Sequence, residues 1–470
     1  MPMFYRLSLI LALVLQAYSA TAESEGAPAG PNPPGRWDAP NAGNPFVPGY
    51  WADPTIIVHD DTFYIYVTTD GPAWGANELT VWHSKDFKNW THTVLNWPGR
   101  DDNVTNVWAP DIIEGADGRF YMYVSINHEI WAGVADHPLG PWRNALDEDK
   151  PFIARDFDPV VHHIDANAFI DDDGKAYLYW GSGWEWKRGP AYVGQLADDM
   201  VSFAKAPRRI HPPRYFEGPY LLKRDGRYFL MYSDGKVSEP TYKIRYSYSD
   251  SPYGPWTEPE QSPILVTSAD RTVFGPGHHS VLQWKGEYYV VYHRDANPFM
   301  GSAYRQLCID RLVFNKDNLI EPMVPTHSGA FPAVTEAEQP VNLAFGAKVT
   351  ASSASENYDA EYILDGNYGT RWSAAEGDDA PSLTIDLGKV KATSRIEIFP
   401  EYATKYYKYR VETSSDGERW QGYSDSGMAA RRGMPWVHEK STDARYVRVS
   451  LFPGKDADAP RQSLWEVKVY

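Results

Sequence analysis

Five ionisable residues recur along this 470-residue chain at a nearly constant distance from a repeated turn. Asp53, Asp111, Asp165, Glu217 and His278 each stand 9 to 11 residues before the strand residue that follows the turn. Each one alone is also typical of a turn or a kink, but scattered charges would not keep this register. Carboxyl and imidazole groups that converge in a concave site are the usual groups of general acid–base catalysis. The spacing therefore predicts one such site, to which every repeat contributes.

The repeated turns predict the fold that would bring these residues together. Each turn is a short polar segment before an apolar strand, and the aligned strand residues are spaced by 57, 56, 52 and 60 residues. This period is close to the length of one four-stranded propeller blade with its connections. The first strand of a blade begins at the central channel, so its first residues face those of the other blades. We therefore expect an all-β fold whose main part is a five-bladed β-propeller.

The segments that carry the ionisable residues resemble the blade motifs of glycoside hydrolase family 43, over about residues 49–329. They are Trp51-Ala-Asp53-Pro, Trp108-Ala-Pro-Asp111, Ile164-Asp165-Ala-Asn, Phe216-Glu217-Gly-Pro and Gly277-His278-His-Ser. The resemblance implies that Asp53 is the general base that activates water and Glu217 the general acid. It also implies that Asp165 orients Glu217 and raises its pKa, as a neighbouring negative charge does. Such a pair, about 6.5 to 9.5 Å apart, inverts the configuration of the sugar.

The same resemblance implies residues that contact substrate and metal. Trp108 and Asp111 would line the substrate pocket, and Arg305 resembles an arginine that reaches it, with a structural salt bridge as the alternative. His278 stands where the family has a histidine that approaches a metal, usually Ca²⁺. Its neighbour His279 is the rival for this place, and a core histidine is the structural alternative, because Ca²⁺ prefers oxygen ligands. We expect no organic cofactor.

From Asn342 the sequence resembles a discoidin, or coagulation factor V/VIII C-type, β-sandwich of the jelly-roll kind, over residues 342–470. The motifs include Asn342-Leu-Ala-Phe-Gly, Ile363-Leu-Asp365-Gly-Asn, Leu383-Thr-Ile-Asp-Leu-Gly and Tyr409-Arg-Val-Glu-Thr. Modules of this kind attached to hydrolases resemble family 32 carbohydrate-binding modules. The resemblance implies a structural Ca²⁺ bound by oxygen ligands, with a solvated turn as the alternative. The implied ligands are Asp365, Thr370 and Glu466, and the candidate sugar contacts are Tyr402, Tyr406, Arg431 and Trp436.

The remaining segments predict how the chain is delivered and divided. Residues 1–22 combine Arg6, a short apolar stretch and Ala20-Thr-Ala22, which is typical of a cleaved signal peptide and predicts export, to the periplasm or the outside. Residues 23–48 form a leader rich in proline and glycine. Residues 330–341 form a proline-punctuated linker, so we expect the propeller (49–329) to work on small substrates without the sandwich.

Composition limits the partners. The formal net charge of −17, without a cluster of basic residues, argues against nucleic acid and is compatible with a neutral polysaccharide or oligosaccharide. No segment beyond the signal peptide is apolar enough to span a membrane. The single cysteine, Cys308, excludes internal disulfides and lies in an apolar strand pattern, where a reactive thiol is not expected. We expect a monomer.

These observations predict an exported, inverting glycoside hydrolase that removes terminal sugars from a polysaccharide. The resemblance favours an α-L-arabinofuranosidase, with β-D-xylosidase, β-D-galactofuranosidase and endo-arabinanase as alternatives that loop shape would decide. A non-catalytic carbohydrate-binding protein or an adhesion protein is the alternative from another class. The intact trio of carboxyls argues against it.

Overall fold

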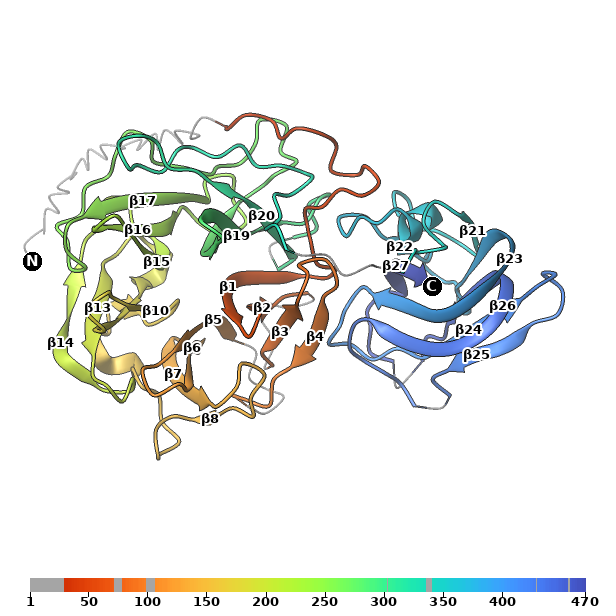
Figure 1. The fold of residues 1–470 in the computed structure, drawn as a ribbon, viewed down its shortest axis with the longest axis horizontal. Helices are drawn as coiled ribbons and strands as arrows, with labels where there is room; N and C mark the ends of the chain where they lie inside the picture. Colours follow the sequence, from red (N-terminus) through yellow and green to blue (C-terminus); the bar gives the residue numbers. More distant parts are fainter. Residues whose placement is uncertain are drawn as a thin grey trace, which may run out of the picture.

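Two β-rich parts make up the protein. The structure, a computed structural model, describes residues 29–71, 78–98, 106–301, 303–334, 340–427, 429–454 and 457–470. Five antiparallel sheets surround a central axis, and one larger sheet lies beside this ring (Figure 1). The predicted five-bladed propeller and the C-terminal sandwich are thus confirmed. The predicted signal peptide lies outside the described residues, as does the first part of the leader.

The blades follow one another along the chain. Blade one contains β1 (Trp51–His59), β2 (Thr62–Thr69), β3 (Thr80–Ser84) and β4 (Thr91–Val94). Blade two contains β5 (Val107–Glu114), β6 (Phe120–Ile126), β7 (Glu129–Ala135) and β8 (Arg143–Asn144). Blade three contains β10 (Asn167–Ile170), β11 (Ala176–Trp180), β13 (Ala191–Leu196) and β14 (Phe203–Ile210). Blade four contains β15 (Glu217–Arg224), β16 (Arg227–Asp234) and β17 (Lys243–Ser249), and blade five β18 (Gly277–Trp284), β19 (Glu287–Asp295) and β20 (Arg305–Leu312).

The repeated turns join the first and second strands of the blades, as the sequence predicts. In blades one, four and five the loop has two residues, both in the left-handed region, which matches the twist of the flanking strands. Their φ angles are 47° and 55° at Asp60-Asp61, 50° and 75° at Asp225-Gly226, and 50° and 84° at Lys285-Gly286.

Blades four and five differ from the four strands predicted for every blade. Among the described residues each has three strands. After β17 the chain contains Pro252, Pro255, Pro259 and Pro263, which have no N–H to donate to a ladder. Only two isolated bridges, Tyr248 to Thr257 and Ile244 to Leu265, remain of a fourth strand in blade four.

An irregularity at the start of each blade turns a backbone position toward the axis. The residues there have positive φ: Asp53 (50°), Ala109 (45°), Asp165 (58°), Gly218 (60°) and His278 (30°). In blades one, two, four and five this position coincides with a shift in the register between the first two strands. Bulges of this kind redirect side chains, and strained residues of this kind cluster at functional sites.

Hydrogen bonds from these irregular positions tie each blade to the one before it and close the ring. In every case the backbone N–H donates to a side chain of the preceding blade. The pairs are Ala109 to Thr68 Oγ1 (2.8 Å), Asp165 to Ser125 Oγ (2.9 Å), Gly218 to Asp165 Oδ2 (3.1 Å), His278 to Ser233 Oγ (2.9 Å) and Asp53 to His293 Nδ1 (3.2 Å). The last pair joins blade one to blade five, so the same contacts that close the propeller also position the ionisable residues.

The C-terminal part is built on one antiparallel sheet with two long, bent strands. Its strand order is β22-β27-β23-β26-β24-β25, and β21 also pairs with β23. The strands are β21 (Lys348–Ala351), β22 (Trp372–Ser373), β23 (Ser382–Pro400), β24 (Tyr409–Ser414), β25 (Gln421–Asp425), β26 (Trp436–Leu451) and β27 (Ser463–Val469).

The two parts share one buried core. The hydroxyl of Tyr50 donates to Glu401 Oε1 at 2.7 Å, and the Tyr50 ring lies 5.4 Å from the ring of Trp465. Glu401 is fully buried and is paired with Arg371 at 3.1 Å and Arg461 at 2.7 Å. These contacts join the residues just before β1 to the sandwich, so the sandwich is not simply tethered to the propeller.

This shared core corrects two of the candidate sugar contacts. Tyr402 is 3% exposed, because its ring packs on Tyr50 at 5.7 Å in the interface between the two parts. Trp436 is 5% exposed and stacks on Tyr409 with ring centroids 4.1 Å apart. Neither can bind a sugar in this conformation. Tyr406 and Arg431 are exposed.

Candidate active site

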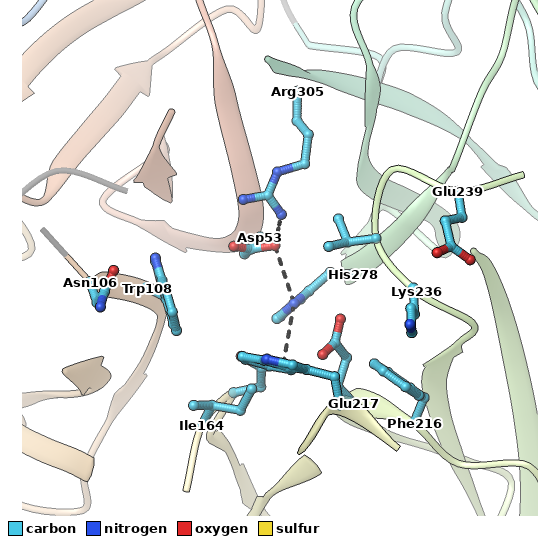
Figure 2. Close-up of a pocket in the computed structure, with 13 residues that line it drawn as sticks. Asp53, Asn106, Trp108, Ile164, Phe216, Glu217, Lys236, Glu239, His278 and Arg305 are labelled. Atoms are coloured by element: carbon cyan, nitrogen blue, oxygen red, sulfur yellow. Dashed lines mark hydrogen bonds and ion pairs between the residues drawn. The ribbon is translucent and has the colours of Figure 1, made fainter. Parts of the chain in front are cut away.

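One pocket of about 520 Å³ opens at the axis of the propeller and contains the predicted catalytic trio. Asp53, Asp165 and Glu217 line it, although they come from blades one, three and four. His278 of blade five and Arg305 of β20 line it too, and Figure 2 shows Arg305, Asp53 and His278 in a chain of contacts. The backbone irregularities described above therefore deliver one ionisable side chain from each of four blades to a single cavity.

Asp53 is held in its ionised form by cationic and hydrogen-bonding neighbours. Arg305 donates to Asp53 Oδ1 at 2.9 Å, and Thr68 donates to Oδ2 at 2.7 Å. Burial alone would raise the pKa of Asp53, but Arg305, His278 and His293 outweigh it and hold this pKa well below its usual range. Asp53 is thus a carboxylate that stays charged at low pH.

Arg305 is itself fixed by a second carboxylate. It donates to both oxygens of Asp70, at 2.7 and 3.1 Å. Burial opposes its charge, but Asp53 and Asp70 outweigh burial and raise the pKa of Arg305. The two alternatives for Arg305, reaching the pocket and forming a structural salt bridge, therefore hold at once.

Glu217 and Asp165 form the opposite kind of environment. Among the described residues, the hydroxyl of Tyr242 donates a hydrogen bond to the Glu217 carboxyl, at 2.9 Å from Oε1. Burial is the main cause that raises the pKa of Glu217 to about 7. Burial and then the charge of Glu217 raise the pKa of Asp165 well above its usual range. The two carboxyls repel a second negative charge, so the pair retains a proton near neutral pH.

His278 connects the two environments. Its Nδ1 lies 3.3 Å from Asp53 Oδ1 and 3.7 Å from Asp165 Oδ2. Burial lowers the pKa of His278, although Asp53 opposes this shift. The imidazole therefore bridges the ionised carboxylate and the protonated pair. Its rival His279 does not line the pocket and is 2% exposed.

Asp111 lies outside the pocket, unlike the predicted substrate contact. It stands two residues beyond Ala109, the irregular position of blade two, so its side chain points into the junction between blades. It accepts hydrogen bonds from Thr55 Oγ1 at 2.8 Å and from the backbone N–H of Ala168 at 2.7 Å. Counting along the sequence could not detect this offset, because the bulge decides which residue faces the axis. Trp108 does line the pocket.

Several residues of the site carry no sequence signal as clear as the repeat. Asp70 follows β2 directly, Tyr242 precedes β17, and His293 lies within β19. Each contacts a predicted residue: Asp70 contacts Arg305, Tyr242 contacts Glu217 and His293 contacts Asp53. Strand ends near the axis are the one hint that the sequence offers for Asp70. The other two become recognisable only when the blades are placed around the ring.

The two predicted metal sites, one at His278 in the propeller and one at Asp365 and Glu466 in the sandwich, differ in the ligand atoms that they offer to a metal. Within the described residues, no group of three or more His, Cys, Asp or Glu side chains is placed to hold a metal ion. In the propeller, His278 already faces two carboxylates, and its neighbours His279 and His293 have buried ring nitrogens that find no hydrogen-bond partner among the described residues. This nitrogen-rich set does not fit Ca²⁺, which prefers oxygen.

The predicted calcium residues of the sandwich do lie together. Thr370 Oγ1 donates to Asp365 Oδ2 at 2.7 Å, and the N–H of Gly366 donates to Glu466 Oε2 at 3.3 Å. Glu466 Oε1 is buried and has no hydrogen-bond partner within the part of the chain that the structure describes. Burial raises the pKa of Asp365 to about 7 and that of Glu466 well above its usual range, the latter with help from Asp365. A fully buried carboxyl beside a half-buried one, with an oxygen that has no hydrogen-bond partner among the described residues, fits a hard cation.

The pocket thus combines an ionised carboxylate with a carboxyl that keeps its proton. Pairs of titratable groups whose surroundings push their pKa values apart are the arrangement used for combined acid and base catalysis. A proton donor and a proton acceptor on different blades can act on opposite sides of a bond held between them.

Comparisons with known proteins agree with this geometry. The family model described as "Glycosyl hydrolases family 43" matches residues 42–320, and that of the "F5/8 type C domain" matches residues 348–463. A solved structure titled "Glycoside hydrolase" superposes with a TM-score of 0.77 at 29% identity, covering 93% of this chain and all of that one.

Characterised relatives cover the propeller. The chain is 32% identical over 318 residues to a beta-D-galactofuranosidase of Aspergillus niger, across 61% of this chain and 86% of that protein. It is 28% identical over 329 residues to an arabinoxylan arabinofuranohydrolase of Paenibacillus polymyxa, across 59% of this chain but only 51% of that relative. It is 27% identical to a xylosidase/arabinosidase of Bacteroides ovatus, across 58% of this chain and 95% of that one. The propeller with its acid–base pocket and the family match over most of its length lead to one conclusion: the chain belongs to family 43 of the glycosyl hydrolases and is an O-glycosyl hydrolase.

Proposed function

We propose that the protein is an inverting glycosidase that removes terminal α-L-arabinofuranosyl residues from a neutral polysaccharide or its oligosaccharides. The observation that carries this proposal is the contrast between Asp53 and Glu217 in one pocket. Asp53 is ionised beside Arg305, whereas the pKa of Glu217 is raised to about 7. The buried side chains of Asp53, Glu217 and Arg305 line this pocket of about 520 Å³, which suits a terminal sugar.

In the proposed reaction Glu217 and Asp53 act on opposite sides of the anomeric carbon. Glu217 donates its proton to the glycosidic oxygen as the bond from that oxygen to the anomeric carbon breaks. Asp53 accepts a proton from water while the water oxygen bonds to the same carbon from the other side, so the configuration inverts. Asp165 shares a proton with Glu217, because the charge of Glu217 raises the pKa of Asp165, and its Oδ2 accepts the N–H of Gly218, the residue after the acid.

Two furanose sugars are supported by named relatives, besides the β-D-xylose that the xylosidases among the relatives support. The arabinoxylan arabinofuranohydrolases and the xylosidase/arabinosidases among the relatives support α-L-arabinofuranose. The beta-D-galactofuranosidase, with 32% identity over 318 residues, supports β-D-galactofuranose as the second candidate. Both are terminal furanosides, which a pocket of the same size can hold.

Purified protein tested on 4-nitrophenyl glycosides of both furanoses and of β-D-xylose would identify the sugar. Cleavage of the arabinofuranoside well above the other two supports the first candidate, and preference for the galactofuranoside supports the second. Proton NMR shows which anomer of the released sugar forms first, and this measurement tests whether the configuration inverts. Activity on none of these substrates, together with retardation in a polysaccharide gel, would favour the non-catalytic alternative.

We further propose that the protein is exported by its N-terminal segment and works as a monomer. Among the described residues no helix is long and apolar enough to cross a membrane. The sandwich would hold Ca²⁺ through Asp365 and Glu466, and its exposed Tyr406 and Arg431 are candidates to contact carbohydrate. Secretion of the full chain, with cleavage after Ala22, is the observation that would support export.

A further inference from the structure

Two tryptophans stand on a short turn of blade three at the edge of the active-site pocket. The turn is η2 (Trp184–Trp186), and the two indoles are 37% and 40% exposed. Trp186 lines the active-site pocket, whereas Trp184 lines a second cavity of about 590 Å³. Exposed tryptophans are uncommon unless they bind something, since each could bury a large apolar surface.

A stack of rings joins the two cavities. The imidazole of His162 stacks on Trp186 with centroids 4.4 Å apart and on Trp184 with centroids 4.7 Å apart, at interplanar angles of 17° and 22°. His128 lies 4.3 Å from His162 and 5.8 Å from Trp108, a residue of the active-site pocket. The exposed indoles of Trp186 and Trp184, supported by the buried imidazole of His162, therefore form an aromatic surface between the active-site pocket and the second cavity.

The backbone of the turn is strained in a way that keeps both indoles at the surface. Glu185 and Trp186 are consecutive residues with positive φ, 56° and 55°, and neither is glycine. Left-handed non-glycine residues are strained, and outside hairpin turns such residues cluster at binding and catalytic sites. The imidazole beneath the indoles has no hydrogen-bond partner on either nitrogen within the described residues, and burial is the main cause that lowers its pKa to about 4. It is therefore a neutral support for the rings.

The second cavity has the polar groups that a sugar requires. Besides Trp184 it is lined by Glu129, Asp156, Arg155 and Pro159. The Arg155 guanidinium lies 5.8 Å from the centre of the Trp184 ring. An aromatic face bordered by a few hydrogen-bonding side chains is the usual composition of a small-molecule site, and carboxylates can accept hydrogen bonds from hydroxyl groups.

We propose that this cavity is a distal sugar subsite, in which Trp184 stacks against a neutral sugar of the substrate chain beyond the scissile bond. The proposal rests on the proposed function: a chain whose terminal sugar fills the active-site pocket can leave it past Trp186, which lines that pocket. The aromatic surface then offers the next sugars a path to Trp184. The subsite would let the enzyme prefer oligomers and polymers over short substrates.

The test compares Trp184→Ala with Trp184→Phe, which keeps a flat ring. Substrates are the 4-nitrophenyl glycoside that the wild-type enzyme cleaves best and the polysaccharide that carries the same terminal sugar. We expect Trp184→Ala to lower kcat/KM on the polymer at least fivefold, mainly through KM, because the lost stacking acts on binding. Activity on the aryl glycoside stays within twofold of wild type, which also shows that the variant folds, and Trp184→Phe restores most of the activity on polymer.

Three outcomes would overturn the proposal: equal loss on both substrates, no loss on polymer, or a change in oligomeric state on size-exclusion chromatography that marks Trp184 as a contact between copies. If no aryl glycoside is cleaved, the proposed function fails separately. Electrophoresis in gels that contain arabinoxylan, arabinan, xylan or a galactofuranose-bearing glycan then tests the subsite alone. Retardation that is weaker for Trp184→Ala than for wild type supports the subsite, and equal retardation in every gel overturns it.

Discussion

At the residue scale, the two carboxyls proposed to do the chemistry differ in their neighbours rather than in their burial. Asp53 and Glu217 are 7% exposed each. Arg305 and Thr68 donate to Asp53, whereas a tyrosine hydroxyl is the partner of Glu217. Similar desolvation thus yields a lowered pKa in one residue and a raised pKa in the other, since only Asp53 has a cation beside it.

Replacing each carboxyl should separate the two roles. Glu217→Ala should lower kcat/KM about 10²- to 10⁴-fold on natural glycosides but far less on aryl glycosides with good leaving groups, which depart without a proton. Asp53→Ala should lower both alike, because water must be activated whatever departs. Rates on a series of aryl glycosides of graded leaving-group pKa would measure this. The reverse pattern would exchange the two assignments.

The pH profile should report the same contrast. Glu217 acts in its protonated form, so kcat/KM should fall as the pH rises through about 7. Asp53 acts in its ionised form, and its lowered pKa should place the acid limb below the usual carboxyl range of about 4. Asp165→Asn should move the alkaline limb to lower pH, because one carboxylate beside Glu217 is removed.

The exposed Asp172, in the same blade, offers a control for the Asp165 variant. Asp172→Asn should leave both limbs in place, since its carboxylate pairs with Lys223 outside the pocket. An alkaline limb near pH 5 in the wild-type enzyme would contradict the assignment of Glu217 as the acid.

At the element scale, hydrogen bonds to the preceding blade hold the start of the first strand in each blade, and these bonds position the residues of the site. Thr68, at the end of β2, shows this most clearly. Its hydroxyl donates to Asp53 Oδ2 and accepts the N–H of Ala109 in blade two, at 2.7 and 2.8 Å. One buried side chain thus joins two blades and orients the proposed base.

Thr68→Val keeps the shape of this residue and removes its hydroxyl. It leaves a buried N–H and a carboxylate oxygen each without a partner, so we expect a loss of about 1 to 3 kcal/mol in unfolding free energy and a lower kcat. Denaturant melts and steady-state kinetics measure the two effects. Thr62→Val, at the other end of β2, removes a hydroxyl that donates to the Asp60 carbonyl and should leave kcat unchanged. Equal kinetic effects of the two variants would contradict the role of Thr68.

At the scale of the whole molecule, the sandwich is part of the structure that holds the active site. Glu401 accepts the hydroxyl of Tyr50, and the carbonyl of Tyr50 accepts the N–H of Asp70 at 3.1 Å. Asp70 in turn fixes Arg305, which binds Asp53. The proline-rich boundary predicts a separable module, but these contacts lead us to expect the opposite.

Deletion of residues 342–470 should therefore lower the melting temperature of the propeller and its activity even on a small aryl glycoside. A point variant tests the same idea with less disruption. Glu401→Gln leaves the buried Arg371, and the partly exposed Arg461, without their carboxylate and should cost about 3 to 5 kcal/mol. Glu412→Gln, at the more exposed pair with Arg448, should cost about 1 kcal/mol or less. If the truncated protein keeps wild-type stability and activity, the propeller folds and works independently of the sandwich.

Calcium should stabilise the sandwich through its buried carboxyls. We expect added Ca²⁺ to raise the melting temperature and EDTA to lower it, because a ligand that binds only the folded state stabilises it. Glu466→Gln should abolish this dependence, since Glu466 offers the free oxygen. Differential scanning calorimetry of both proteins with and without Ca²⁺ measures the effect. If added Ca²⁺ and EDTA both leave the melting temperature of the wild-type protein unchanged, the carboxyls of Asp365 and Glu466 do not bind Ca²⁺.

The sequence by itself determined the number of blades, the hairpin turns and four of the residues that meet at the axis. These features are local or periodic: a two-residue turn with left-handed residues and a period near 56 residues can be read without knowing which strands touch. For the same reason Asp53, Asp165, Glu217 and His278 could be named in advance.

Only the tertiary structure decided which side chains face inward and what surrounds them. A bulge at Ala109 turned Asp111 into the junction between blades, and packing against Tyr50 buried Tyr402. His293, a hydrogen-bond partner of Asp53, lies 240 residues from it along the chain, so ring closure alone brings the two together. Backbone irregularities and contacts between distant segments depend on the whole fold, and no local pattern of residue types encodes them.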